Sequence, residues 1–141
     1  MKVLVIDDEP VIRTLMRDVL SQRGIEVVTA GDADEAVARF LEGGVEMIIL
    51  DHRMPGTSGA ELHRLLSEEF GSGGRTGAGA RRKLPPVLIV TGSPQDREVI
   101  IAAFGESVVG VLPKPFVAED LVKIVLDTLG QGFSGGHPVQ Q

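Results

Sequence analysis

Five short runs of valine, isoleucine and leucine recur along the chain, and segments with a helical spacing of apolar residues separate them. Such short apolar runs are typical of strands buried on both faces, as in a parallel sheet between two layers of helices. Alternating strands and helices imply right-handed crossovers, which bring the carboxyl ends of the strands to one edge of the sheet. The sequence therefore predicts an α/β fold with a doubly wound, five-stranded parallel sheet, whose strands we expect at Lys2–Ile6, Glu26–Ala30, Val45–Leu50, Val87–Val90 and Val108–Leu112.

The helices between these strands carry start and stop signals. Pro10 suits the first position of a helix, and apolar residues then recur at helical spacing until Gly24, a residue type that favours a helix end. Either Asp32 or Asp34 is expected to cap a second helix, which ends before the pair Gly43-Gly44. Three further helices are expected near residues 62–70, from about Pro94 to Phe104, and from Val117 to Leu129.

The length of 141 residues suits one domain with a full hydrophobic core, and we place it at residues 1–129. Residues 71–83 (GSGGRTGAGARRK) are a Gly/Arg-rich insertion without apolar periodicity; a solvated loop is the simplest interpretation and a docking patch for an acidic partner is the alternative. Residues 130–141 are expected to form a flexible tail.

Composition excludes several classes of function. The chain has no cysteine, which rules out disulfides and thiolate metal sites. The net charge of −6 argues against general nucleic-acid binding. No apolar stretch approaches the roughly 18 residues of a membrane span, and acidic residues directly after the first apolar run are unlike a secretory signal. We therefore expect a cytoplasmic protein without nucleic-acid or membrane partners.

Polar residues follow four of the five apolar runs, where each strand is expected to end. Asp7 and Asp8 follow the first run, Asp51 the third, Thr91 the fourth and Lys114 the fifth. Open α/β sheets bind their ligands at this carboxyl edge. Each residue alone could equally cap a helix or lie in a loop, but their joint placement at successive strand ends favours one binding site.

The chemistry of these residues indicates the ligand. Three neighbouring carboxylates repel one another unless a cation is bound or their pKa values rise, and all-oxygen ligation suits Mg²⁺. A carboxylate can also attack phosphorus to form an aspartyl phosphate. The ammonium of Lys114 and the hydroxyl of Thr91 could then bind phosphoryl oxygens. The sequence predicts a site for a hard cation and a phosphoryl group.

With these motifs the chain resembles the receiver (response regulator) domains of bacterial two-component signalling systems, over about residues 1–129. The resemblance lies in the pair Asp7-Asp8, the run D-x-x-M-P-x-x-x-G-x-E-L from Asp51 to Leu62, Thr91-Gly92, and the sequence Lys-Pro-Phe that starts at Lys114. It implies a flavodoxin-like (βα)5 sheet with strand order 2-1-3-4-5.

The resemblance also implies roles for the acidic residues. Asp51 would be the phosphoacceptor, taking its phosphoryl group from a histidine kinase or a phosphotransfer protein in a reaction that depends on Mg²⁺. The cation would bind Asp8, Asp51 and the backbone carbonyl of Arg53. Asp7 would act mainly through a metal-bound water.

The same resemblance assigns the remaining site residues. Lys114 would contact the phosphoryl group, and Thr91 would move towards it after phosphorylation. Pro115 would follow a cis peptide bond. Val111 stands where many receivers carry an aromatic residue that turns inward with the threonine, so any switch here works without that ring.

Two features are particular to this chain. The side chain of Arg53 either pairs with the phosphoryl site or points to solvent. The segment Val99–Phe104 and the last helix are apolar over more than one face. Together with strand five they predict a contact surface for a downstream protein target or a dimer mate, although core packing alone is the alternative.

We therefore expect a phosphorylation switch that acts by protein–protein contact or relays its phosphoryl group, and not an enzyme that turns over a separate substrate. We expect a receiver without an output domain, and a receiver fragment of a hybrid histidine kinase is the alternative. A phosphatase with an aspartyl-phosphate intermediate is a second alternative, but the haloacid-dehalogenase type would want an aspartate at Arg53. A flavin or nucleotide binder would need a glycine loop where Asp7-Asp8 stands.

Overall fold

The computed structural model describes residues 2–51, 61–62, 64–66, 84–92, 98, 101–102 and 105–134. In these residues the described strands form one parallel sheet in the order β2-β1-β3-β4-β5, which confirms the expected topology. The elements are β1 (Lys2–Ile6), α1 (Pro10–Ser21), β2 (Glu26–Ala30), α2 (Ala33–Leu41), β3 (Met47–Asp51), β4 (Val87–Thr91), the 3-10 turn η2 (Gly105–Ser107), β5 (Val108–Pro113) and α5 (Ala118–Ser134).

The helix signals of the sequence act where they were expected. Pro10 is the first residue of α1, and Gly24 follows the helix with φ of 80°, a left-handed conformation that glycine adopts without strain. The N-cap of α2 is Asp32, not Asp34: its carboxylate accepts a hydrogen bond from the backbone N–H of Glu35 at 2.8 Å. The cap closes the first turn of α2 directly after β2.

Strands β3, β4 and β5 each end one residue later than the apolar runs predict, and β3 begins at Met47 instead of Val45. Pairing in the ladder continues to Asp51, which lies opposite Val90, and to Thr91, which lies opposite Pro113. The backbone hydrogen-bonding pattern does not depend on side-chain polarity, so the strands do not stop where the apolar residues do. Two candidate site residues are therefore held in the sheet itself.

The last helix also differs from the prediction. It continues past its expected end at Leu129 to Ser134. The flexible tail stays a prediction. Extending an existing helix adds one hydrogen bond for each residue fixed, which allows a helix to outlast its apolar stripe. Residues 135–141, the insertion 71–83 and the segment 52–60 lie outside the described residues, as does most of the expected helix from Pro94 to Phe104.

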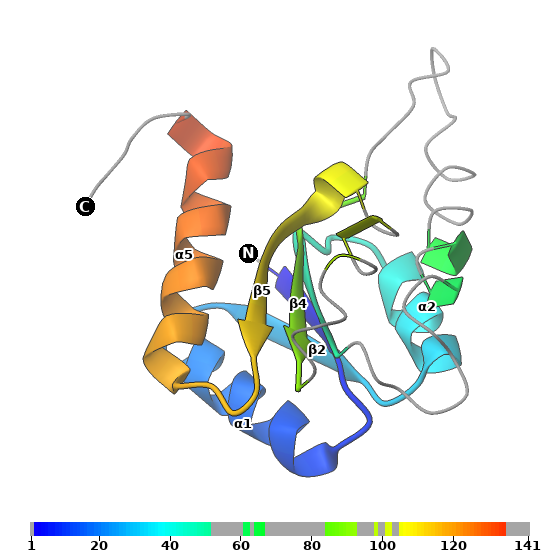
Figure 1. The fold of residues 1–141 in the computed structure, drawn as a ribbon, viewed down its shortest axis with the longest axis horizontal. Helices are drawn as coiled ribbons and strands as arrows, with labels where there is room; N and C mark the ends of the chain where they lie inside the picture. The colour runs from blue at the N-terminus through cyan, green and yellow to red at the C-terminus, as the bar shows by residue number, and fades with distance from the viewer. Residues whose placement is uncertain are drawn as a thin grey trace.

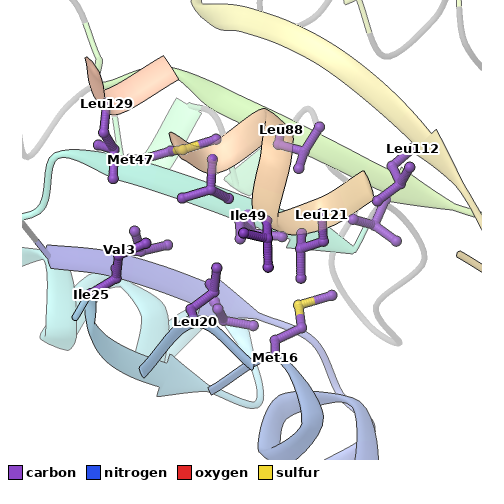
Figure 2. Close-up of a cluster of buried hydrophobic side chains, with 14 residues drawn as sticks. Val3, Met16, Leu20, Ile25, Met47, Ile49, Leu88, Leu112, Leu121 and Leu129 are labelled. Atoms are coloured by element: carbon purple, nitrogen blue, oxygen red, sulfur yellow. The ribbon is translucent and has the colours of Figure 1, made fainter. Parts of the chain in front are cut away.

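Alternate residues of each strand point to opposite faces of the sheet and bury two cores. Helices α1 and α5 cover one face and α2 covers the other (Figure 1). On the first face, side chains from both helices and from the central strands share one cluster, which Figure 2 shows. This cluster includes Val3, Met16, Leu20, Ile25, Met47, Ile49, Leu88, Leu112, Leu121 and Leu129. The rigid sheet between the two cores carries the candidate site at its carboxyl edge.

Candidate functional site

Three carboxylates meet at the carboxyl ends of β1 and β3. Asp7 and Asp8 follow β1, and Asp51 is the last residue of β3; the two strands are direct neighbours in the sheet. One oxygen from each carboxylate lies within 4.8 Å of the others. Asp7 and Asp51 are buried and Asp8 is half-buried. The structure thus brings together the acids that the strand-end pattern predicted.

Lys114 joins this cluster from the end of β5. Its ammonium lies 3.3 Å from Oδ2 of Asp51, 3.6 Å from Oδ2 of Asp7 and 3.7 Å from Oε1 of Glu9. Its backbone N–H donates to the carbonyl of Thr91 at 2.8 Å, which ties the ends of β4 and β5 together. The Lys114–Pro115 peptide bond is cis, as the resemblance implied.

Thr91 is fully buried as the last residue of β4. It follows Val90, which pairs with Asp51 in the ladder, so β4 brings the threonine to the same edge as the acids. Val111 is half-buried in β5 and packs against the core on the α2 side. Arg53, whose carbonyl was expected to bind the cation, lies outside the described residues.

The electrostatics of the cluster are dominated by Asp7. Burial disfavours its charged form and raises its pKa from 3.8 to about 6; the hydrogen bond from Glu9 N–H opposes this, while the neighbouring charge of Asp51 adds to it. Partial burial lowers the pKa of Lys114, but the nearby carboxylates of Asp51 and Asp7 outweigh burial, so the pKa lies above its ordinary value. Lys114 therefore stays protonated at neutral pH.

The residues present fit a hard divalent cation. Oδ1 of Asp7 accepts a hydrogen bond from the backbone N–H of Glu9 at 2.9 Å, whereas the buried Oδ2 has no hydrogen-bond partner among the described residues. A buried carboxylate oxygen without a donor is costly unless a cation compensates it. With oxygens of Asp8 and Asp51 beside it, the donor set is all oxygen, as Mg²⁺ requires.

Two residues near the site had not been singled out in the sequence. Glu9 supplies the third carboxylate near Lys114 and closes the turn after β1 through its N–H. Arg13 donates from Nη1 to the backbone carbonyl of Asp7 at 2.7 Å. The sequence does carry a signal for Arg13: it is a cation in the first turn of a helix, where the helix dipole disfavours positive charge.

Comparisons with known proteins agree with this geometry. The model of the response regulator receiver domain matches residues 3–126. The transcriptional regulatory protein ResD of Bacillus subtilis is 31% identical over 121 residues, which cover 86% of this chain and 45% of ResD. The chemotaxis protein CheY of Pseudomonas aeruginosa is 31% identical over 122 residues, which cover 86% of this chain and 90% of that protein.

Among solved structures, the response regulator TrrA of Thermotoga maritima, in complex with Mg²⁺-BeF, has a TM-score of 0.67 and 27% identity, over 90% of this chain and 97% of that chain. This chain spans about half the length of several curated relatives that it matches, ResD among them. Among the helices that the structure describes, none combines the length and hydrophobicity needed to cross a bilayer.

Proposed function

This chain belongs to the family of response regulator receiver domains, which are signalling switches of two-component systems, and we propose that its switch is phosphorylation of Asp51. The observation that carries the proposal is the position of Asp51. Asp51 is the last residue of the central strand β3, and its carboxylate lies beside those of two further acids. The Lys114 ammonium lies 3.3 Å from its Oδ2.

The proposed reaction is an in-line transfer to a carboxylate. An oxygen of Asp51 attacks the phosphorus of a phosphohistidine on the donor protein; the new P–O bond forms as the P–N bond breaks, and the released imidazole takes up a proton from water. The rigid sheet holds the nucleophile in place, and burial excludes most competing water from its surroundings.

Mg²⁺ is the cofactor that the acidic residues would hold. Asp8 and Asp51 would bind it directly with the backbone carbonyl of Arg53, and Asp7 would act through a metal-bound water. When bound, the cation neutralises charge on the phosphoryl oxygens and offsets the repulsion among the acids. Oδ2 of Asp7, which is buried and accepts no hydrogen bond from the described residues, supports this assignment, as does the raised pKa of Asp7.

Lys114 and Thr91 complete the proposed phosphoryl site. The ammonium bonds Asp51 before the reaction, and afterwards a phosphoryl oxygen takes over as its partner, because that oxygen carries more negative charge. The Thr91 hydroxyl then moves to a second phosphoryl oxygen, and the shift passes through β4 to the neighbouring β5.

Receiver domains interact with histidine kinases and with downstream effectors. For this chain we propose a histidine kinase or phosphotransfer protein as the donor. The output surface would be formed by the helix expected from about Pro94 to Phe104, together with β5 and α5. Among the described residues there, Ile101 and Val109 are exposed and apolar. The contact would be with a protein target or a second copy of the chain, without nucleic acid.

Acetyl phosphate tests the proposal without a cognate kinase. In the presence of Mg²⁺ it should add one base-labile phosphoryl group to the wild-type protein and none to Asp51→Asn, as intact mass would report. A chelator should abolish the labelling, since the acids then repel the incoming phosphate. Labelling that persists in Asp51→Asn would remove Asp51 from its role.

A further inference from the structure

We propose that Arg13 is a positioning residue for the acidic cluster: its guanidinium, seated against Gly31, fixes the turn between β1 and α1 that carries Asp7 and Asp8. The inference rests on the proposed binding of Mg²⁺ to this cluster and adds a residue from outside it. Arg13 is half-buried in α1, and it contacts the main chain of Asp7.

Three hydrogen bonds hold Asp7. Its N–H donates to the carbonyl of Ala30 at 3.1 Å, its Oδ1 accepts from the N–H of Glu9 at 2.9 Å, and its carbonyl accepts from Nη1 of Arg13 at 2.7 Å. The last is charge-assisted and short, as expected of a strong bond. With these bonds in place, Oδ2 is left to face the cluster. Arg13 thus supplies one of the contacts that set the direction of the Asp7 carboxylate.

Gly31 provides the space that the guanidinium occupies. A Cβ at this position would lie 2.8 Å from Nη1 and 3.3 Å from Cζ of Arg13. The need is for space and not for an unusual backbone, because φ of Gly31 is outside the left-handed region. The N–H of Gly31 also donates to Oε1 of Glu35 in α2 at 2.9 Å, and this hydrogen bond fixes the backbone of Gly31 beside the guanidinium.

The choice of acceptor explains why a cation can serve here without occupying the metal site. A guanidinium paired with Asp8 or Asp51 would compete with Mg²⁺ for the same oxygens. Bound to the carbonyl of Asp7, Arg13 orders the turn and leaves the carboxylates available. The contact resembles the outer-shell hydrogen bonds that orient metal ligands in other proteins.

The test is a double-mutant cycle with Arg13→Ala and Gly31→Ala, read by Mg²⁺ titration and by amide exchange of Glu9 in metal-free protein. Arg13→Ala should weaken Mg²⁺ binding about tenfold, the lower end for lost outer-shell partners, and speed exchange of the Glu9 amide. Gly31→Ala should weaken binding severalfold by displacing the guanidinium. The double variant should match Arg13→Ala, since the added methyl then no longer meets the guanidinium.

Two controls separate positioning from charge and from stability. Arg17→Ala removes an exposed cation from the same helix and should leave Mg²⁺ affinity within twofold. Arg13→Lys keeps the charge on a single donor nitrogen and should restore part of the affinity lost in Arg13→Ala. If Arg13→Ala is poorly folded, Arg13→Lys and Gly31→Ala still give the comparison, because both keep a cation at the site.

Failure of this inference differs from failure of the proposed function. If the wild type neither binds Mg²⁺ nor accepts a phosphoryl group, the proposed function is wrong. If the wild type does both, Mg²⁺ affinity unchanged or tighter in Arg13→Ala would overturn the positioning role. If the two substitutions had additive effects on Mg²⁺ affinity, Gly31 would not act by leaving space for the guanidinium.

Discussion

Asp7 bears the main electrostatic penalty of the site, and this has a consequence for stability. The side chain is 1% exposed, and its pKa is raised from 3.8 to about 6. The folded protein therefore binds a proton more tightly than the unfolded chain does. The contribution of Asp7 to the free energy of unfolding is therefore fully present below pH 4, and it is lost as the pH rises through 6 and the folded protein loses this proton.

We predict that Asp7→Asn stabilises the metal-free protein at neutral pH. The rise of the pKa from 3.8 to about 6 corresponds to about 3 kcal/mol at pH 8, and the difference between variant and wild type should be small at pH 4. Urea unfolding in a chelator at several pH values measures it. An equal difference at pH 4 and pH 8 would contradict the assignment of the raised pKa to Asp7.

Lys114 allows a second prediction at the scale of one residue. Lys114→Ala removes a positive charge 3.3 Å from Asp51, so it should bind Mg²⁺ at least as tightly as the wild type. Its labelling by acetyl phosphate should slow by about a hundredfold, the effect of losing one preorganised charge-stabilising donor. Lys123→Ala, an exposed lysine of α5, is the control. A labelling rate close to wild type would show that the ammonium does not assist the transfer.

At the scale of elements, the packing of α5 on the sheet should decide the stability of the face behind the site. Leu121 is fully buried among residues of α1, α5 and the strands. Leu121→Ala should lower the free energy of unfolding by about 2–5 kcal/mol, the range for buried leucines. Leu41→Ala makes the same chemical change at a residue that is 59% exposed and should cost less than about 1 kcal/mol. Denaturant midpoints of the two variants would differ little if α5 were only loosely attached.

The strands could be predicted from the sequence more fully than the contacts around the site. Strands β1 and β2 begin and end as their apolar runs predict, because burial on both faces leaves a continuous signal. The convergence of the five site residues follows from the strand order, which the resemblance to receiver domains implied; these residues are Asp7, Asp8, Asp51, Thr91 and Lys114. The hydrogen bond from Arg13 to the carbonyl of Asp7 does not, since it depends on the path of one turn and on the space beside Gly31. Spacing along the chain carries no record of such a main-chain contact.

At the scale of the whole molecule, four of the five strands end in the site. In the proposed function, a charge added at the end of β3 would be bound by a lysine that follows β5 and a threonine that ends β4. Since β4 and β5 are paired in the sheet, we expect a change at their carboxyl ends to reach the β5 and α5 side of the molecule. The assignment of that side as the output surface stays a prediction.

The central claim, that Asp51 accepts the phosphoryl group, is tested most directly by trapping the acyl phosphate where it forms. Protein labelled with acetyl phosphate and Mg²⁺ is treated with borohydride, which reduces an aspartyl phosphate to homoserine, and is then digested and sequenced by mass spectrometry. We predict homoserine at position 51 only, and none when Mg²⁺ is chelated. Homoserine at position 7 or 8, with Asp51 unchanged in a protein that has taken up phosphate, would contradict the account.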